Sequence, residues 1–104
     1  LMKRVYIAGP MTGLPDLNFP AFHAEAGRLR ALGYEVANPA EINPDPTAGW
    51  QACMRADIAQ LVTCDGVRLL EGWERSRGAS LEAHIAHSLG MRLVYPGEQI
   101  GAPA

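Results

Sequence analysis

The sequence has no long hydrophobic run, few cysteines and no excess of basic residues, and each of these absences excludes a class of protein. No stretch of about 18 apolar residues is present, so we expect no membrane-spanning helix and no membrane partner. The start, LMKRVYIAGP, lacks the apolar core of a secretory signal, which predicts a cytoplasmic protein. With 9 Lys or Arg against 11 Asp or Glu, the net charge of -2 argues against a nucleic-acid polymer as partner.

Cysteine and histidine are also sparse, and their positions predict neither a metal site nor another cofactor. Cys53 and Cys64 show no paired ligand spacing, and without a secretory context we expect two buried thiols rather than a disulfide. His23, His84 and His87 lack the spacing of a metal site, and we expect all three at the surface.

The pattern of apolar residues predicts a single α/β domain spanning residues 1–104. A chain of this length buries roughly 65% of its unfolded surface, which suffices for one core. Short apolar runs predict strands at residues 5–8, 34–37, 66–70 and 91–95. Helical spacing predicts helices at about residues 18–32, 49–63 and 76–88. This alternation favours a three-layer α/β/α fold with a four- to five-stranded parallel sheet, of the flavodoxin or Rossmann type.

Each predicted helix has an apolar stripe that should face the sheet. In chain order the stripes are Phe19, Phe22, Ala26 and Leu29; Trp50, Met54, Ile58 and Leu61; and Leu81, Ile85 and Leu89. Asn18 is placed to cap the first helix and Gly33 to end it. Arg68 does not fit the apolar third strand, and residues 97–104 have the composition of a loosely ordered tail.

Ligands bind parallel sheets of this type outside the carboxyl ends of the strands. Three predicted loops lie there, at residues 9–18, 38–47 and 71–78. The first begins with Gly9, Pro10 and Met11, whose backbone could face an anion, although it matches neither a Walker A loop nor a dinucleotide-binding motif.

The third loop ends in Ser76, Arg77 and Gly78, which begin the last predicted helix. A serine at this position is either a plain N-cap or, with the free backbone amides beside it, part of a phosphate site. Trp73, earlier in the same loop, could stack on a base or pack in the core.

Glu82 carries the strongest chemical signal. At about 100° per residue it projects roughly 20° from Leu89 and roughly 40° from Ala86, which puts a carboxylate on the apolar side of its helix. Burying a carboxylate is costly unless the group is paired, protonated or functional. The alternatives are a buried structural pair and a side chain that reaches solvent over the sheet edge.

Asp57 repeats this pattern on the preceding helix, about 20° from Trp50 and about 40° from Leu61. Two carboxylates that converge on one cleft can divide nucleophile and acid or base roles between them. Alternatively, Asp57 pairs with Arg55 on the surface. Tyr6 is either a core aromatic or the hydrogen-bond donor to such a carboxylate.

Together these motifs resemble the nucleoside 2-deoxyribosyltransferase-like superfamily, close to its nucleotide N-hydrolase branch and to a small bacterial and phage subfamily of uncharacterised domains. The resemblance covers residues 3–95. It rests on Val5-Tyr6-Ile7-Ala8-Gly9-Pro10-Met11, Asp57, Cys64-Asp65, and Ser76-x-Gly78-x-x-x-Glu82 followed by Ala86 and Gly90.

The resemblance implies that Glu82 is a nucleophile. It would attack the anomeric carbon, expel the nucleobase and form a glycosyl ester that water or a second base resolves with retention. Tyr6 would orient this carboxylate, and Asp57 would assist proton transfer. The implied partners are a small-molecule nucleotide or nucleoside and further copies of the chain in a homodimer or larger homo-oligomer.

The residue six positions before the nucleophile separates two branches of this superfamily. It is a serine in members that act on 5′-monophosphates and an aspartate in those that act on nucleosides, so Ser76 favours a 5′-monophosphate, with Arg77 as a second phosphate ligand. Pro10 departs from the serine of the phosphate-binding branch. Three functions remain: an N-glycosidase acting on (deoxy)nucleoside 5′-monophosphates, a nucleoside deoxyribosyltransferase, and an inactive nucleotide-binding or sensor module.

Overall fold

A four-stranded parallel sheet forms the centre of the computed structural model, which describes residues 1–45 and 47–104. The strand order is β2-β1-β3-β4. The strands are β1 (Arg4–Ala8), β2 (Glu35–Ala37), β3 (Gly66–Leu69) and β4 (Arg92–Val94). The helices are α1 (Phe19–Leu32), α2 (Pro39–Ile42), α3 (Trp50–Leu61) and α4 (Arg77–Ser88), with 3₁₀ turns at Pro15–Asn18 and Trp73–Arg75.

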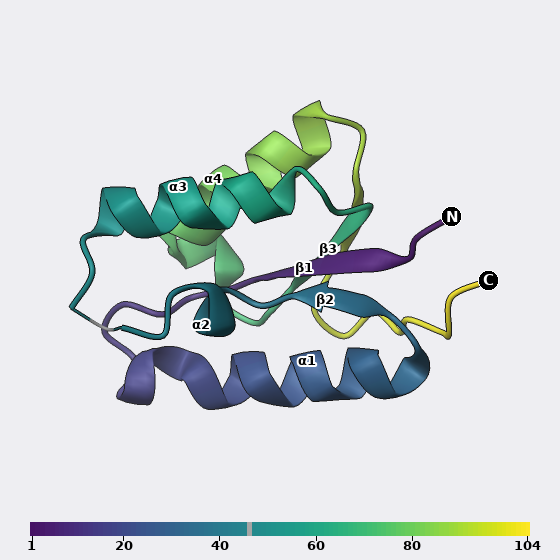
Figure 1. Cartoon of the computed structure of the whole chain (residues 1–104), viewed down its shortest axis with the longest axis horizontal. Helices are drawn as coiled ribbons and strands as arrows, with labels where there is room; N and C mark the ends of the chain where they lie inside the picture. Colours follow the sequence, from purple (N-terminus) through teal and green to yellow (C-terminus); the bar gives the residue numbers. More distant parts are fainter. Residues whose placement is uncertain (46) are drawn as a thin grey trace.

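Helices cover both faces of the sheet, which confirms the three-layer α/β/α prediction (Figure 1). Side chains alternate along β1, so Val5 and Ile7 pack on the side of α1, and Tyr6 and Ala8 pack on the side of α3 and α4. β1 lies between β2 and β3, and its two faces are covered by α1 on one side and by α3 and α4 on the other, so Val5–Ala8 are buried. A residue in β1 can therefore reach a ligand only near the end of the strand.

The apolar stripe predicted for α4 is wrong at two of its three positions: Ile85 packs against the core, but Leu81 and Leu89 do not. Leu81 and Leu89 are 38% and 61% exposed. The face of α4 that packs on the sheet consists of small residues around one carboxylate: Ala79, Glu82, Ala83 and Ala86. Small side chains let the helix approach the bulky residues of the strands closely, and this is what puts Glu82 next to the sheet. No helix in residues 1–45 and 47–104 has both the length and the apolar character needed to cross a bilayer.

Asn18 precedes α1 as predicted, but its side chain does not cap the helix. Asp16, Leu17 and Asn18 all have left-handed backbone conformations, with φ of 52°, 54° and 60°. In this geometry the Asn18 side-chain amide points back along the chain and donates a hydrogen bond to the carbonyl oxygen of Pro10 at 2.9 Å. Asn18 thus ties the loop after β1 to the start of α1.

The loop predicted at residues 38–47 contains the short helix α2. Asn38 is its true cap, because the side-chain oxygen accepts a hydrogen bond from the backbone amide of Ala40 at 3.0 Å. Pro39 occupies the first turn, where the missing amide costs nothing. The sequence pattern fails here because a helix of one turn has no periodicity to detect.

The side chain of Arg68 contacts the residues that follow β4. The Arg68 guanidinium pairs with Glu25 of α1 at 2.8 Å and donates to the carbonyl oxygens of Tyr95 and Glu98. Ile100 is buried in the cluster beneath α1. The residues after β4 are therefore packed on the sheet rather than loosely ordered, and Arg68 is the charged side chain that holds them.

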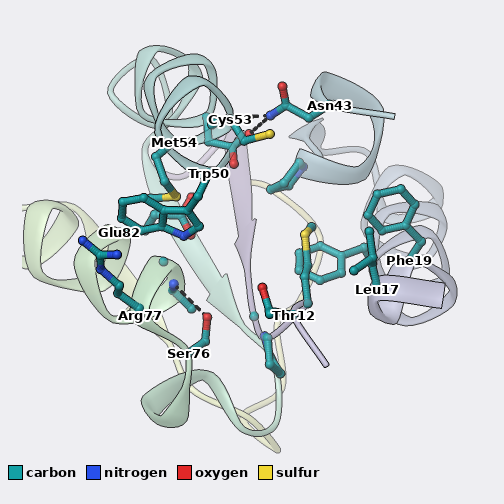
Figure 2. A pocket seen from close by; sticks show the side chains of 18 of the residues that line it. Thr12, Leu17, Phe19, Asn43, Trp50, Cys53, Met54, Ser76, Arg77 and Glu82 are labelled. Atoms are coloured by element: carbon teal, nitrogen blue, oxygen red, sulfur yellow. Dashed lines mark hydrogen bonds between the residues drawn. The ribbon is translucent and has the colours of Figure 1, made fainter. Parts of the chain in front are cut away.

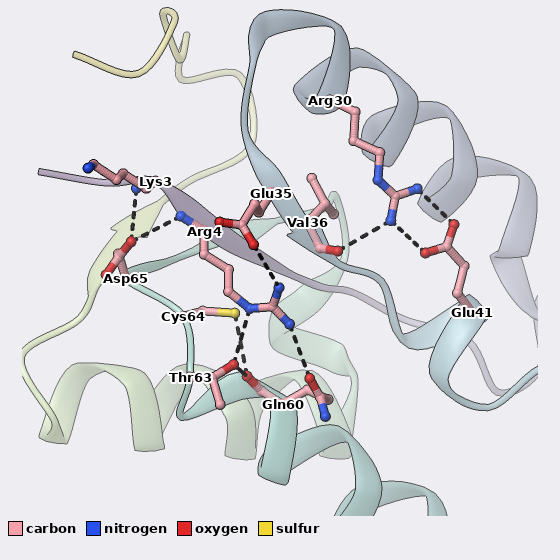
Figure 3. Close-up of polar contacts among 10 residues, drawn as sticks. All are labelled: Lys3, Arg4, Arg30, Glu35, Val36, Glu41, Gln60, Thr63, Cys64 and Asp65. Atoms are coloured by element: carbon pink, nitrogen blue, oxygen red, sulfur yellow. Dashed lines mark hydrogen bonds and ion pairs between the residues drawn. The ribbon is translucent and has the colours of Figure 1, made fainter.

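The amino-terminal edge of the sheet is closed by polar contacts (Figure 3). The Asp65 carboxylate accepts hydrogen bonds from the backbone amides of Lys3 and Arg4 at 2.9 and 3.0 Å. The Arg4 guanidinium donates to Thr63 and Gln60 at the end of α3. These groups are hydrogen-bond partners of one another, so this edge has a structural role. A ligand would then bind at the opposite edge of the sheet.

Candidate active site

A cavity of about 580 Å³ opens at the carboxyl edge of the sheet (Figure 2). The chain leaves β1 toward β2 and later returns to the other side of β1 as β3, so this edge contains the point where the strand order reverses. Ligands of doubly wound folds bind at such a point. The walls come from the loop after β1, the starts of α1, α3 and α4, and the segment between α2 and α3.

Glu82 lies at the floor of this cavity, and Tyr6 contacts it from beneath. Glu82 lines the cavity and is only 4% exposed, and the Tyr6 hydroxyl donates a hydrogen bond to its Oε2. Tyr6 is the third residue of β1 and is fully buried, so its ring fixes the position of the hydroxyl. The buried carboxylate expected from the sequence is thus present, and its partner is the predicted tyrosine.

Burial raises the pKa of Glu82 to about 8. Repulsion by the Asp57 carboxylate acts in the same direction, whereas the hydrogen bond from Tyr6 favours the ionised form and lowers the pKa. Burial also raises the pKa of Tyr6 far above its ordinary value, which keeps the hydroxyl protonated as a donor. Glu82 therefore changes charge within the physiological pH range.

Asp57 is the second buried carboxyl group of the cavity, with 7% exposure. Burial raises its pKa to about 6, against the opposite effect of a hydrogen bond from Asn43. The Asn43 side-chain amide donates to Asp57 Oδ1 at 2.7 Å and to the carbonyl oxygen of Cys53 at 3.3 Å. The surface pair with Arg55 is not formed, and Asp57 is held by the segment that follows α2.

Ser76, Arg77 and Gly78 lie at the rim of the cavity, where α4 begins. The Ser76 hydroxyl oxygen accepts a hydrogen bond from the Ala79 amide at 3.2 Å, so it caps the helix. Gly78 lies against Met54 of α3; a Cβ added there would come within 3.1 Å of the Met54 sulfur. The two helices thus approach each other closely at their amino-terminal ends.

Gly9, Pro10 and Met11 line the cavity from the loop after β1. A Cβ on Gly9 would lie 2.8 Å from the Cβ of Leu70, so only glycine allows this loop to pass so close to the end of β3. The loop is therefore positioned by its contact with the neighbouring strand and by Asn18.

Trp73 does not line the cavity. Its ring packs beside the cluster beneath α4 and lies 6.2 Å from the ring of Tyr95, centroid to centroid. The aromatic residues that do line the cavity are Phe19, Phe22 and Trp50. Of these, Trp50 is 37% exposed although the helical pattern assigns it to a buried stripe. Its position as the first residue of α3, directly after Gly49, is the signal that could have found it.

The hydrogen bond of Asn43 to Asp57 is not predicted from the sequence either, because an asparagine in a turn-rich segment can have many structural roles. The three histidines are exposed as expected and Cys64 is buried, whereas Cys53 is only half-buried, because it lies on the face of α3 that lines the cavity. Within residues 1–45 and 47–104, no three His, Cys, Asp or Glu side chains group together as metal ligands would.

A sequence-family model described as "Domain of unknown function (DUF4406)" matches residues 3–95. A comparison with curated proteins gave no match. Among solved structures, a 2-deoxyribosyltransferase from the psychrotolerant bacterium Bacillus psychrosaccharolyticus superposes with a TM-score of 0.70 at 18% identity. The match covers 94% of this chain and 77% of that one.

A conserved protein from Enterococcus faecalis V583 superposes with a TM-score of 0.66 at 26% identity. The match covers 91% of this chain and 63% of that protein, so the chain spans just under two thirds of its length. These likenesses confirm the fold expected from the resemblance to deoxyribosyltransferase-like proteins.

Proposed function

The chain belongs to the DUF4406 family, and we propose that it is an N-glycosidase that hydrolyses a (deoxy)nucleoside 5′-monophosphate to a free base and a sugar phosphate. The observation that carries this proposal is that two buried carboxyl groups, Glu82 and Asp57, line one cavity and that Tyr6 donates a hydrogen bond to Glu82 from beneath it. A carboxyl group held in this way is poised to attack an electrophilic carbon.

In the first step one oxygen of ionised Glu82 bonds to the anomeric carbon, and the bond from that carbon to the base nitrogen breaks. The electron pair of that bond stays on the base, which takes a proton from Asp57. In the second step water attacks the same carbon and loses its proton to Asp57, and the ester bond to Glu82 breaks. Two displacements on one carbon give retention of configuration.

The protonation states of the two carboxyl groups determine the pH range in which these two steps can run. With pKa values of about 6 and about 8, the pair holds one proton between these limits. Because Glu82 has the higher pKa, that proton lies mostly on Glu82, and the productive arrangement, with the proton on Asp57 and Glu82 ionised, is the less populated of the two. We therefore expect hydrolysis to be fastest between about pH 6 and pH 8, with a bell-shaped profile.

The phosphate is proposed to bind at the start of α4. Ser76 supplies a hydroxyl and Arg77 a cation, and the helix amino terminus favours an anion there. Ser76 and Glu82 are six residues apart, about 9 Å along the helix axis, so one helix can address both the 5′ end and the anomeric carbon of a nucleotide. Gly9, Pro10 and Met11 are proposed to line the sugar from the opposite wall.

A panel of nucleoside and deoxynucleoside 5′-monophosphates, incubated with the protein and analysed for free base by chromatography, tests the proposal. We expect at least one member to release its base, with loss of release in Glu82→Ala. Full activity of Glu82→Ala, or an inactive wild type on every nucleotide and nucleoside, would contradict it.

Base transfer and binding without turnover are the two alternatives. The likeness of the fold to a 2-deoxyribosyltransferase favours transfer as the second candidate. Incorporation of an added acceptor base into a new nucleoside would indicate a transferase. Tight nucleotide binding without product, unaffected by Glu82→Gln, would indicate a sensor module.

A further inference from the structure

One cation at the rim of the cavity is held by an aromatic ring and by no carboxylate. The guanidinium carbon of Arg77 lies 3.9 Å from the centroid of the Trp50 ring, a distance typical of a cation–π contact. Trp50 is the first residue of α3 and Arg77 the first of α4, so the contact joins the amino-terminal ends of two helices (Figure 2).

Trp50 has no evident role in the core. It belongs to neither buried cluster and is 37% exposed, although its side chain is among the largest in the chain. Gly78 lies beside this contact: an added Cβ would be in ordinary van der Waals contact with the indole nitrogen at 3.7 Å and would lie 3.1 Å from the Met54 sulfur. The packing of α3 on α4 thus serves to present this ring at the rim.

Arg77 keeps its hydrogen-bond donors available. Within the described residues its side chain forms no ion pair or hydrogen bond, although the carboxyl groups of Asp45, Asp57 and Glu82 also line the cavity. Stacking uses the flat face of a guanidinium and leaves the N–H groups in its plane free. In an arginine paired with a carboxylate, those N–H groups would already be donating hydrogen bonds.

We propose that Trp50 is a positioning residue that holds Arg77 ready for the 5′-phosphate, and that this pair makes the cavity select phosphorylated over neutral substrates. The inference rests on the proposed function and extends it to the selection of substrate. Arg77 lies five residues before Glu82, about 7.5 Å along the helix axis, so a phosphate at Arg77 stays away from the buried carboxyl groups that would repel it. The in-plane donors of Arg77 match phosphate oxygens.

Calorimetric titration with the four common 2′-deoxynucleoside 5′-monophosphates and their matching nucleosides tests this proposal. Trp50→Leu removes the ring, Trp50→Phe keeps an aromatic face, and Arg77→Gln removes the cation. Arg55→Gln is the control, because Arg55 is an exposed arginine of α3 that does not line the cavity. Circular dichroism checks that each variant is folded.

We expect Trp50→Leu and Arg77→Gln each to raise the Kd of the preferred monophosphate by about 5- to 30-fold, the range for a loss of one or two kcal/mol. The Kd of the matching nucleoside should stay within about twofold, since it carries no phosphate. Trp50→Phe should retain most of the affinity. The double variant should bind no more weakly than Arg77→Gln, because Trp50 acts through Arg77.

Equal weakening of nucleoside and monophosphate binding by Trp50→Leu would overturn the inference, because it would show that the ring contacts the base or sugar. Unchanged binding of both ligands would overturn it as well. In either case cleavage of nucleotides by the wild type would leave the proposed function standing. A wild type that binds none of these compounds and cleaves no member of the full panel of nucleoside and deoxynucleoside 5′-monophosphates would contradict the proposed function and the inference together.

Discussion

The hydroxyl of Tyr6 donates a hydrogen bond to the carboxyl group of Glu82 inside the protein, 76 positions away along the chain. The tyrosine belongs to a central strand and the glutamate to the sheet-facing side of α4. Both groups are buried, so neither can exchange this partner for water. The hydrogen bond therefore fixes the direction in which the carboxyl group faces the cavity.

Tyr6→Phe should lower the rate of base release by about tenfold or more at neutral pH. The hydrogen bond from Tyr6 lowers the pKa of Glu82, so its loss makes that pKa higher. Each further rise of the pKa by one reduces the ionised fraction of Glu82 at neutral pH about tenfold. The alkaline part of the pH profile should therefore move to higher pH.

Tyr34→Phe is the matched control for Tyr6→Phe. The Tyr34 hydroxyl donates to the carbonyl oxygen of Gly101 at 2.6 Å, on the other face of the sheet, so its loss should leave the pH profile unchanged. A profile equally unchanged in both variants would contradict the role of Tyr6.

Glu82→Gln should stabilise the fold at alkaline pH. The pKa of Glu82 is about 8 in the folded chain against an ordinary value of 4.5, so the stability linked to its protonation is complete below about pH 4.5 and is lost as pH rises through about 8. Glutamine stays neutral and avoids a loss on the order of a few kcal/mol. Urea unfolding should show the variant more stable than the wild type at pH 9 and nearly equal at pH 4.5. Glu71→Gln, at an exposed position, should show no such difference.

Asn43→Ala should move the acidic part of the pH profile toward neutral pH. The Asn43 amide stabilises ionised Asp57, so its removal raises the pKa of Asp57 above about 6. Carbon-detected NMR titration of the carboxyl groups measures this change directly. Gln51→Ala removes an exposed amide from the same helix as Asp57 and serves as the control. An Asp57 titration that does not change in Asn43→Ala would show that this amide is not its partner.

Gly9→Ala should destabilise the protein by about 1–3 kcal/mol, because the new methyl group would lie 2.8 Å from the Cβ of Leu70 and force the loop and β3 apart. Gly27→Ala is the matched control in α1. A Cβ there meets nothing within 4 Å, and helix propensity predicts a gain of about 0.5–1 kcal/mol. Thermal unfolding of both variants measures the difference between the two stability changes. If the loop after β1 could move away from Leu70 freely, Gly9→Ala would not be destabilised.

The sequence predicts the layers of the fold and the burial of the two carboxyl groups, Asp57 and Glu82. Strands buried on both faces form short continuous apolar runs, and helices of several turns repeat their apolar residues at a definite period, against which a carboxylate such as Glu82 stands out. The neighbours of Glu82 on the buried face are not predicted, however. Leu81 and Leu89 look like the core of α4, and the alanines that truly face the sheet do not.

The rim of the site is harder to predict because its contacts join residues far apart in the chain. Nothing local to Asn43 indicates that its amide reaches Asp57, and nothing local to Trp50 indicates that its ring receives Arg77. Arg68 is similar, since its partners come from α1 and from the residues after β4, which only the fold brings together. Periodicity reports which face of an element is buried, whereas these pairs depend on how two elements cross.

The central claim is that Glu82 forms a covalent bond to the anomeric carbon of its substrate. Mass spectrometry of protein quenched in acid during turnover of the most rapidly cleaved nucleotide measures this most directly. We predict a mass increase equal to one sugar phosphate less one water, on the peptide that contains Glu82 and not in Glu82→Gln. An adduct on another residue, or undiminished base release by Glu82→Gln, would contradict the claim.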